Sequence, residues 1–154
     1  GTRAGLRRSG RIDRAWSGCV SHAWLLVLGS DDADAAPITA ALAALATLGR
    51  VASLTGLRRS PDAEGADRWF TNRLVRLDTP LARDALVEQL QRIERDIGRL
   101  EHSDAVPIDI DLLACDTNAA DKSDAWQLDH YAADKGEQCR AHVLALLKEA
   151  GINL

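Results

Sequence analysis

IDIDLL, residues 108–113, is the most informative stretch of this 154-residue chain. Its strict alternation predicts a β-strand whose isoleucines face a core. Asp109 and Asp111 would then project from the opposite face, about 7 Å apart. Carboxylates at this spacing need a cation or solvent between them, and Mg²⁺ prefers carboxylate oxygens together with substrate phosphates. The stretch therefore indicates either a metal site or a half-exposed strand with an acidic solvent face.

The chain from residue 23 to residue 57 predicts a strand, a helix and a second strand. Residues 23–28 are all apolar and end at Gly29, as a buried strand does at a turn. An Ala-rich stretch with apolar residues at helical spacing follows, and we expect Asp34 to cap this helix and Gly49 to end it. Residues 51–57 alternate as a strand does, and the breakers around Ser60 predict a long loop.

Residues 69–113 predict a strand, a helix and a strand. Residues 69–77 form the first of these, and Thr79 followed by Pro80 is typical of a helix start. The helix would carry one apolar stripe and end at Gly98; its stripe is Leu86, Leu90, Ile93 and Ile97. With IDIDLL, the order βαββαβ predicts a ferredoxin-like α+β fold, an antiparallel sheet with both helices on one face. A C-terminal helix over residues 138–150 would extend this core.

Composition and length predict one domain. Hydrophobic residues make up 46% and charged residues 27% of the chain, and only six side chains are aromatic, so the core must be mainly aliphatic. We expect this domain to span residues 21–154. Residues 1–20 hold five arginines and one aspartate without an apolar period, which predicts a basic N-terminal tail.

Charge and cysteine content exclude several classes of partner. The net charge of −4 offers no general attraction for nucleic acid or an anionic membrane. No apolar run approaches the roughly 18 residues of a membrane span. The three cysteines lack CxxC spacing, which favours free thiols in a reducing compartment. We therefore expect a cytoplasmic monomer that binds small molecules.

Several fragments, in order and approximate spacing, resemble the 6-hydroxymethyl-7,8-dihydropterin pyrophosphokinase family. They are Gly29-Ser30, Ser60-Pro61, Phe70-Thr71-Asn72, Ile93-Glu94, Gly98-Arg99, IDIDLL, His130-Tyr131 and residues 140–144. Each fragment is weak alone, whereas their joint order agrees with the βαββαβ pattern. The resemblance implies an enzyme of folate biosynthesis that transfers the pyrophosphoryl group of ATP to a pterin hydroxymethyl oxygen and releases AMP.

The resemblance also implies a role for each matching residue. It assigns catalysis to Asp109, Asp111 and Arg99, pterin binding to Ser60, Phe70 and Asn72, and nucleotide binding to Glu94, His130 and Arg140. The two aspartates would hold a pair of Mg²⁺ ions that bridge the phosphates. Plain core packing is the alternative for Phe70, and a solvated helix end is the alternative for Glu94 and Arg99.

One segment departs from the family pattern. The family carries basic residues, a Trp and a Pro-Arg pair between the helix and the D-x-D strand, whereas residues 100–107, LEHSDAVP, hold no Arg, Lys or Trp. Arginines of the other long loop, Arg58, Arg59 or Arg68, could compensate. The sequence therefore leaves two functions open. One is a Mg²⁺-dependent pyrophosphokinase, weakened because residues 100–107 lack the basic residues that would bind phosphate. The other is a non-catalytic relative that binds pterin or nucleotide.

Overall fold

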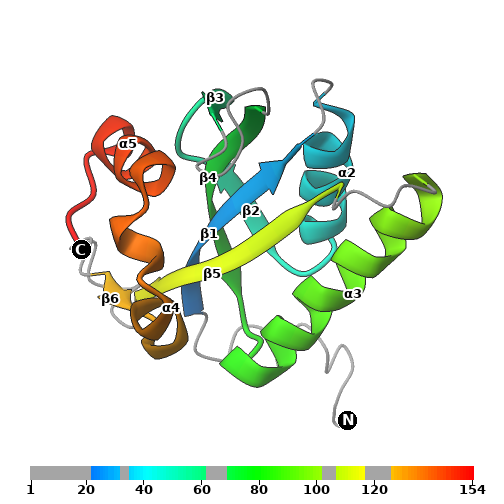
Figure 1. Ribbon diagram of the computed structural model, residues 1–154. Coiled ribbons are helices and arrows are strands. Elements are labelled where there is room, and N and C mark those ends of the chain that lie inside the picture. The colour runs from blue at the N-terminus through cyan, green and yellow to red at the C-terminus, as the bar shows by residue number, and fades with distance from the viewer. Residues whose placement is uncertain (1–21, 32–34, 62–68, 102–106, 117–125) are drawn as a thin grey trace, which may run out of the picture.

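A computed structural model describes residues 22–31, 35–61, 69–101, 107–116 and 126–154, and for residues 99–101 it describes the backbone only. Six strands in these ranges form one antiparallel sheet (Figure 1). They are β1 (His22–Ser30), β2 (Arg50–Ser53), β3 (Arg58–Pro61), β4 (Trp69–Thr79), β5 (Asp109–Asp116) and β6 (Gln127–Leu128). Their order is β2-β4-β1-β5-β6, and β3 also pairs with β4. The three long strands β4, β1 and β5 therefore lie side by side in the middle of the sheet.

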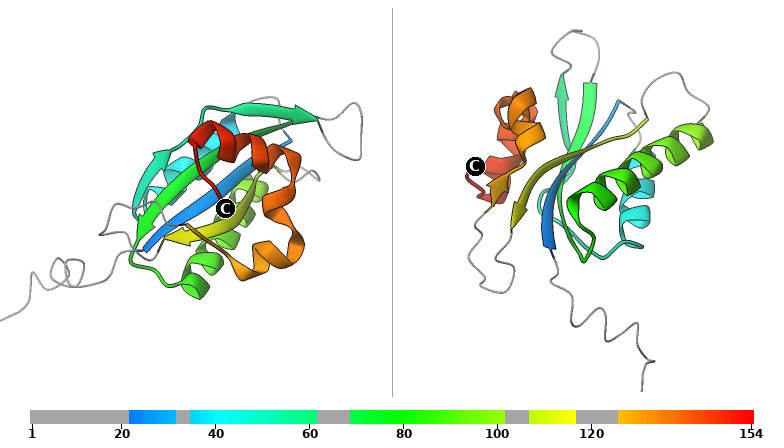
Figure 2. Two further views of the ribbon diagram at one scale, coloured as in Figure 1. Left: turned by 90° about the vertical axis from the view of Figure 1, so that its left-hand side faces the viewer. Right: turned by 90° about the horizontal axis from the view of Figure 1, so that it is seen from below.

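Helices cover both faces of this sheet (Figure 2). The helices α2 (Ala36–Leu45) and α3 (Arg83–Glu101) pack on one face. On the other lie α4 (His130–Lys135), the short 3-10 helix Glu137–Cys139 and α5 (Ala141–Ala150). This arrangement confirms the predicted ferredoxin-like α+β fold with a C-terminal helical extension. None of the described helices is long and apolar enough to cross a membrane.

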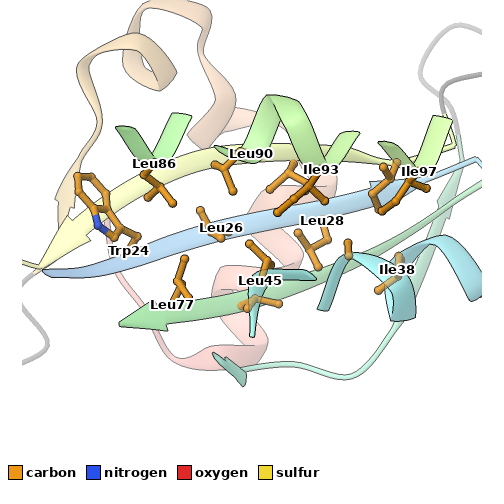
Figure 3. Close-up of a cluster of buried hydrophobic side chains, with 14 residues drawn as sticks. Trp24, Leu26, Leu28, Ile38, Leu45, Leu77, Leu86, Leu90, Ile93 and Ile97 are labelled. Carbon is orange, nitrogen blue, oxygen red and sulfur yellow. The ribbon is translucent and has the colours of Figure 1, made fainter. Parts of the chain in front are cut away.

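The larger core lies between the sheet and the helices α2 and α3. The stripe predicted from helical spacing is buried, and it packs against Trp24, Leu26 and Leu28 of β1 (Figure 3). Apart from Trp24, these labelled side chains are aliphatic, as the scarcity of aromatic residues predicts. Burying each such leucine contributes roughly 1.5–3 kcal/mol. This core fixes the sheet against α3.

A second, smaller core joins α5 to the opposite sheet face. Val143, Leu146 and Leu147 pack on β1, β4 and β5. Leu113 and Ala114 both belong to this core although they are neighbours, because the β1–β5 register shifts between Leu25 and Leu26. A β-bulge of this kind places two consecutive side chains on one face.

The predicted helix boundaries need correction. Helix α2 begins after Ala35, which makes no side-chain cap, and Asp34 lies outside the described residues. It ends at Leu45 rather than at Gly49. Gly49 is needed for a different reason, because a Cβ there would lie 2.0 Å from the backbone oxygen of Asp78.

Helix α3 also starts and ends later than its local signals predicted. Thr79 is the last residue of β4, and α3 begins at Arg83 and continues through Gly98 to Glu101. The Thr79 hydroxyl donates to the Leu48 carbonyl (2.8 Å) and accepts from the Leu81 N–H (3.3 Å). Thr79 therefore ends a strand and organises the turn that follows, instead of capping the helix.

Two segments fold differently from expectation. The predicted strand over 51–57 stops at Ser53, and Ser60-Pro61 belongs to strand β3 rather than to a loop. The C-terminal helix begins at Ala141, and helix α4 precedes it. Gly136 ends α4 with a φ of 68°, a left-handed conformation that favours glycine. The predicted N-terminal tail lies outside the described residues.

Candidate active site

A cavity of about 1000 Å³ opens on the sheet face that carries α5. Its lining comes from segments far apart in the sequence: strand β3, the sheet strands β1, β4 and β5, and the start of α5. Residues 58–61 form one side, and the two aspartates of β5 belong to the same lining. The cavity therefore brings together most of the residues that the resemblance assigned to function.

The pairing of β3 with β4 forms an amide and aromatic corner of this cavity. Ser60 lies opposite Phe70 in the register, and the Asn72 side-chain amide donates to the Ser60 hydroxyl (2.9 Å). Asn72 is only 4% exposed, and a Cβ on Gly29 would lie 3.0 Å from its Oδ1. The glycine thus leaves room for the carboxamide. Half-buried Phe70 lines the cavity and is absent from the two described cores.

This corner has the chemistry to bind a flat heterocycle. An aromatic face such as that of Phe70 stacks on a ring system. A carboxamide both donates and accepts, so Asn72 can pair with a ring edge that offers both kinds of group. Ser60, Phe70 and Asn72 are therefore close together, as the family resemblance implied, and their orientation depends on a strand that local sequence signals did not predict.

Asp109 and Asp111 line another part of the same cavity. Asp109 is exposed, and Asp111 is half-buried. Burial raises the pKa of the Asp111 carboxyl to about 7, and the negative charge of Asp109 adds to this rise. Two carboxylates on one strand face therefore repel each other in the absence of a cation.

The donor set at β5 fits a divalent cation such as Mg²⁺. Mg²⁺ is commonly bound by one or two carboxylates, with water and substrate phosphates as its other ligands. In the part of the chain that the structure describes, no group of three or more His, Cys, Asp and Glu side chains could hold a metal by itself. Asp109 and Asp111 would therefore need oxygens from a substrate to complete the coordination.

Glu94 contributes to the position of β5 and is not part of the cavity lining. Its carboxylate accepts a hydrogen bond from the Ile110 N–H (2.8 Å), between the two aspartates in the sequence. Burial raises the pKa of Glu94 to about 7, although the Ile110 hydrogen bond acts in the opposite direction. Glu94 thus joins α3 to the acidic end of β5. The alternative that Glu94 is only a solvated residue at a helix end does not account for this contact.

The start of α5 contributes basic groups. Arg140, the residue before the first turn of α5, lines the cavity and lies 3.3 Å from buried Glu137. His142 also lines the cavity, and its pKa is lowered by burial and by the charge of Arg140. Sequence reasoning gave His142 no role, although it lies inside the fragment 140–144 that carried the resemblance.

Two other predicted residues are not described as part of the cavity. His130 is exposed at the first position of α4 and is not among the lining residues. The backbone of Arg99 lies in α3, and its side chain falls outside the described residues.

Comparison with known proteins agrees with this geometry. A family model described as 7,8-dihydro-6-hydroxymethylpterin-pyrophosphokinase matches residues 25–150, from β1 to the end of α5. No curated protein matches the chain.

Proposed function

The chain belongs to the 7,8-dihydro-6-hydroxymethylpterin-pyrophosphokinase family, and we propose on this premise that it transfers the pyrophosphoryl group of ATP to 6-hydroxymethyl-7,8-dihydropterin, with AMP as the second product. Both substrates are small molecules. The reaction belongs to folate biosynthesis, and we expect a cytoplasmic monomer to carry it out.

One observation carries the proposal: a single cavity is lined by both the Ser60–Phe70–Asn72 corner and the aspartates of β5. The corner suits the pterin ring, with Phe70 on its face and Asn72 at its edge. The aspartates suit a metal-bound triphosphate. A transfer reaction needs its two substrates side by side, and one shared cavity allows this.

In the proposed reaction, the hydroxymethyl oxygen of the pterin attacks the β-phosphorus of ATP and its proton is released to water. The bond between that phosphorus and the oxygen bridging the α- and β-phosphates breaks, and AMP leaves with the bridging oxygen. The chain's own contribution is to position the two reactants and to stabilise charge. Phe70 and Asn72 hold the acceptor, and Glu94 keeps β5 in place through the Ile110 N–H.

The charged groups of the cavity have complementary roles in this proposal. Asp109 and Asp111 would hold Mg²⁺, which when bound neutralises the phosphate charge that develops during transfer. Arg140 would donate to phosphate oxygens. We further propose nucleotide contacts for His130 and a catalytic contact for Arg99, as the family pattern implies.

A non-catalytic role is the second candidate, and one observation favours it. Residues 100–107 contain Glu101 and Asp104 and no Arg or Lys, so this segment would repel a triphosphate. A protein with this segment could retain pterin binding after losing the transfer reaction.

The test is release of AMP from ATP and Mg²⁺ in the presence of 6-hydroxymethyl-7,8-dihydropterin. The wild-type chain is compared with the double variant Asp109→Ala/Asp111→Ala and with Asp134→Ala, an exposed aspartate of α4 outside the cavity lining. Pterin-dependent AMP release that is lost only in the double variant would support the enzyme. Pterin binding without AMP release would favour the non-catalytic role.

A further inference from the structure

Resting on the proposed function, we infer that Arg58 binds the phosphates being transferred and that Glu149 holds Arg58 at the edge of the cavity before they arrive. Arg58 belongs to β3, and Glu149 belongs to α5. Their contact spans 91 positions of sequence.

Strand register places Arg58 on the cavity side of β3. Arg58 lies opposite Asn72, and residues directly opposite each other in an antiparallel pair share a face. Asn72 lines the cavity, and so does Arg58. The next residue, Arg59, also borders the cavity, but it lies opposite Thr71 and its guanidinium carbon is 5.5 Å from the ring centroid of Trp69. The two neighbouring arginines therefore have different partners.

The partner of Arg58 retains it only weakly. Arg58 Nη1 lies 3.4 Å from Glu149 Oε1, and the two side chains are 50% and 38% exposed. Exposed ion pairs with such geometry contribute little, because water competes for both charges. Glu149 has a separate anchor, since its Oε2 accepts from the Gly56 N–H (2.9 Å). Arg58 can therefore leave without releasing Glu149 from the loop.

Arg140, another cavity arginine, is less free to move. It lies 3.3 Å from Glu137, whose side chain is only 4% exposed. Within the described ranges, the other cation near Glu137 is Lys135 at 3.8 Å, and Glu137 Oε2 is buried and has no hydrogen-bond partner there. Drawing Arg140 toward a substrate would leave a buried carboxylate poorly compensated.

The cavity also needs a further cation on chemical grounds. A triphosphate carries several negative charges, and Asp109 and Asp111 add two more at this site. Residues 102–106 contain no Lys or Arg that could offset these charges. Arg58, on the opposite side of the cavity from β5 in the sheet order, can supply this charge, because only an exposed ion pair at 3.4 Å would be lost.

The test compares binding of a non-hydrolysable ATP analogue with Mg²⁺ by the full chain and by Arg58→Gln. We expect the variant to bind the analogue about tenfold more weakly, which is the loss expected for a hydrogen bond between charged groups. Pterin affinity measured without nucleotide should remain unchanged. Arg50→Gln, an exposed arginine of β2 outside the cavity lining, is the matched control and should bind like wild type.

Two further measurements separate binding from a structural role. Glu149→Gln removes the competing charge and keeps an oxygen that can accept from Gly56, so we expect analogue affinity to rise about twofold. Added KCl should weaken analogue binding less steeply in Arg58→Gln than in wild type, because one charged contact is missing.

The outcomes distinguish a failure of the proposed function from a failure of the role of Arg58. If the wild-type chain does not bind the analogue, both the proposed function and the role of Arg58 are overturned. If wild type binds and Arg58→Gln binds equally well with the same salt dependence, only the role of Arg58 is overturned. A fall in analogue affinity on Glu149→Gln would also contradict it, and this variant gives an answer even if Arg58→Gln does not fold.

Discussion

Replacing Asp129 with alanine should destabilise the protein strongly, because this carboxylate joins the start of α3 to the first turn of α4. Asp129 is 7% exposed and precedes the first turn of α4. It accepts two hydrogen bonds from Arg83 at the start of α3, at 2.6 and 3.0 Å. It also accepts from the N–H groups of Tyr131 and Ala132, and its own N–H donates to the Leu113 carbonyl of β5.

The magnitude follows from these contacts. Loss of the helix cap costs about 1 kcal/mol. The paired bonds from Arg83 contribute about 2 kcal/mol, since the guanidinium side chain is 30% exposed and water recovers part of the loss. We therefore expect Asp129→Ala to lower the free energy of unfolding by about 3 kcal/mol. Asp129→Asn should lose about half as much, because asparagine caps a helix as well as aspartate does.

The effect should depend on pH. Burial would raise the pKa of Asp129, but the hydrogen bonds from Arg83 and from the Ala132 N–H outweigh it and hold the pKa below its ordinary value. The folded pKa is therefore lower than the unfolded one of about 3.9. The stabilisation is complete above the unfolded pKa and is lost as the pH falls through the folded pKa.

Urea unfolding at pH 7 and at about pH 3, followed by tryptophan fluorescence, measures both expectations. The control is Asp134→Ala, an exposed aspartate of the same helix, which should change stability by less than about 0.5 kcal/mol. A loss below about 1 kcal/mol in Asp129→Ala at pH 7 would contradict the stabilising role of this carboxylate. A difference from wild type that stays constant from pH 7 to pH 3 would refute the assigned charge.

Two glycine substitutions test close contacts. Gly49→Ala should lower the free energy of unfolding by about 2 kcal/mol or more, because its Cβ would lie 2.0 Å from the Asp78 carbonyl oxygen and the backbone must shift. Thermal denaturation measures this loss. A variant as stable as wild type would contradict the close approach of the two backbones. Gly29→Ala should weaken pterin binding about tenfold with little change in melting temperature, because its Cβ would lie 3.0 Å from Asn72 Oδ1 and displace the carboxamide. Titration calorimetry with the pterin checks the second expectation, and unchanged affinity would show that Asn72 does not need this position.

Periodic patterns predicted the core elements well because each pattern reflects burial of its own segment. The alternation at residues 108–113 and the stripe along α3 are both confirmed, and so is the face of β5 that carries Asp109 and Asp111. Boundary signals were less reliable. Thr79 and Pro80 look like a helix start, but the strand continues through Thr79 because β1 pairs with β4 as far as His22 opposite Thr79.

The candidate site shows the same division. The aspartates could be predicted from one strand, and Phe70 with Asn72 from another, whereas their common cavity depends on how β1, β3 and α5 meet them. Strand β3 was missed because it is a short edge segment ending in proline, and its pairing with β4 is what gives it strand structure. His142 was missed because its place in the cavity depends on the packing of α5.

Three properties were predictable from the amino-acid sequence alone: the order of the main strands and helices, the aliphatic character of the core and the pair of carboxylates on β5. They follow from composition and from periodicity within single segments. Three side-chain contacts depend instead on how distant segments pack: Asn72 with Ser60, Asp129 with Arg83 across 46 positions, and Arg58 with Glu149 across 91. Which side chains become partners depends on the packing of distant segments, and a local sequence pattern does not predict which of many similar charged residues will form a contact.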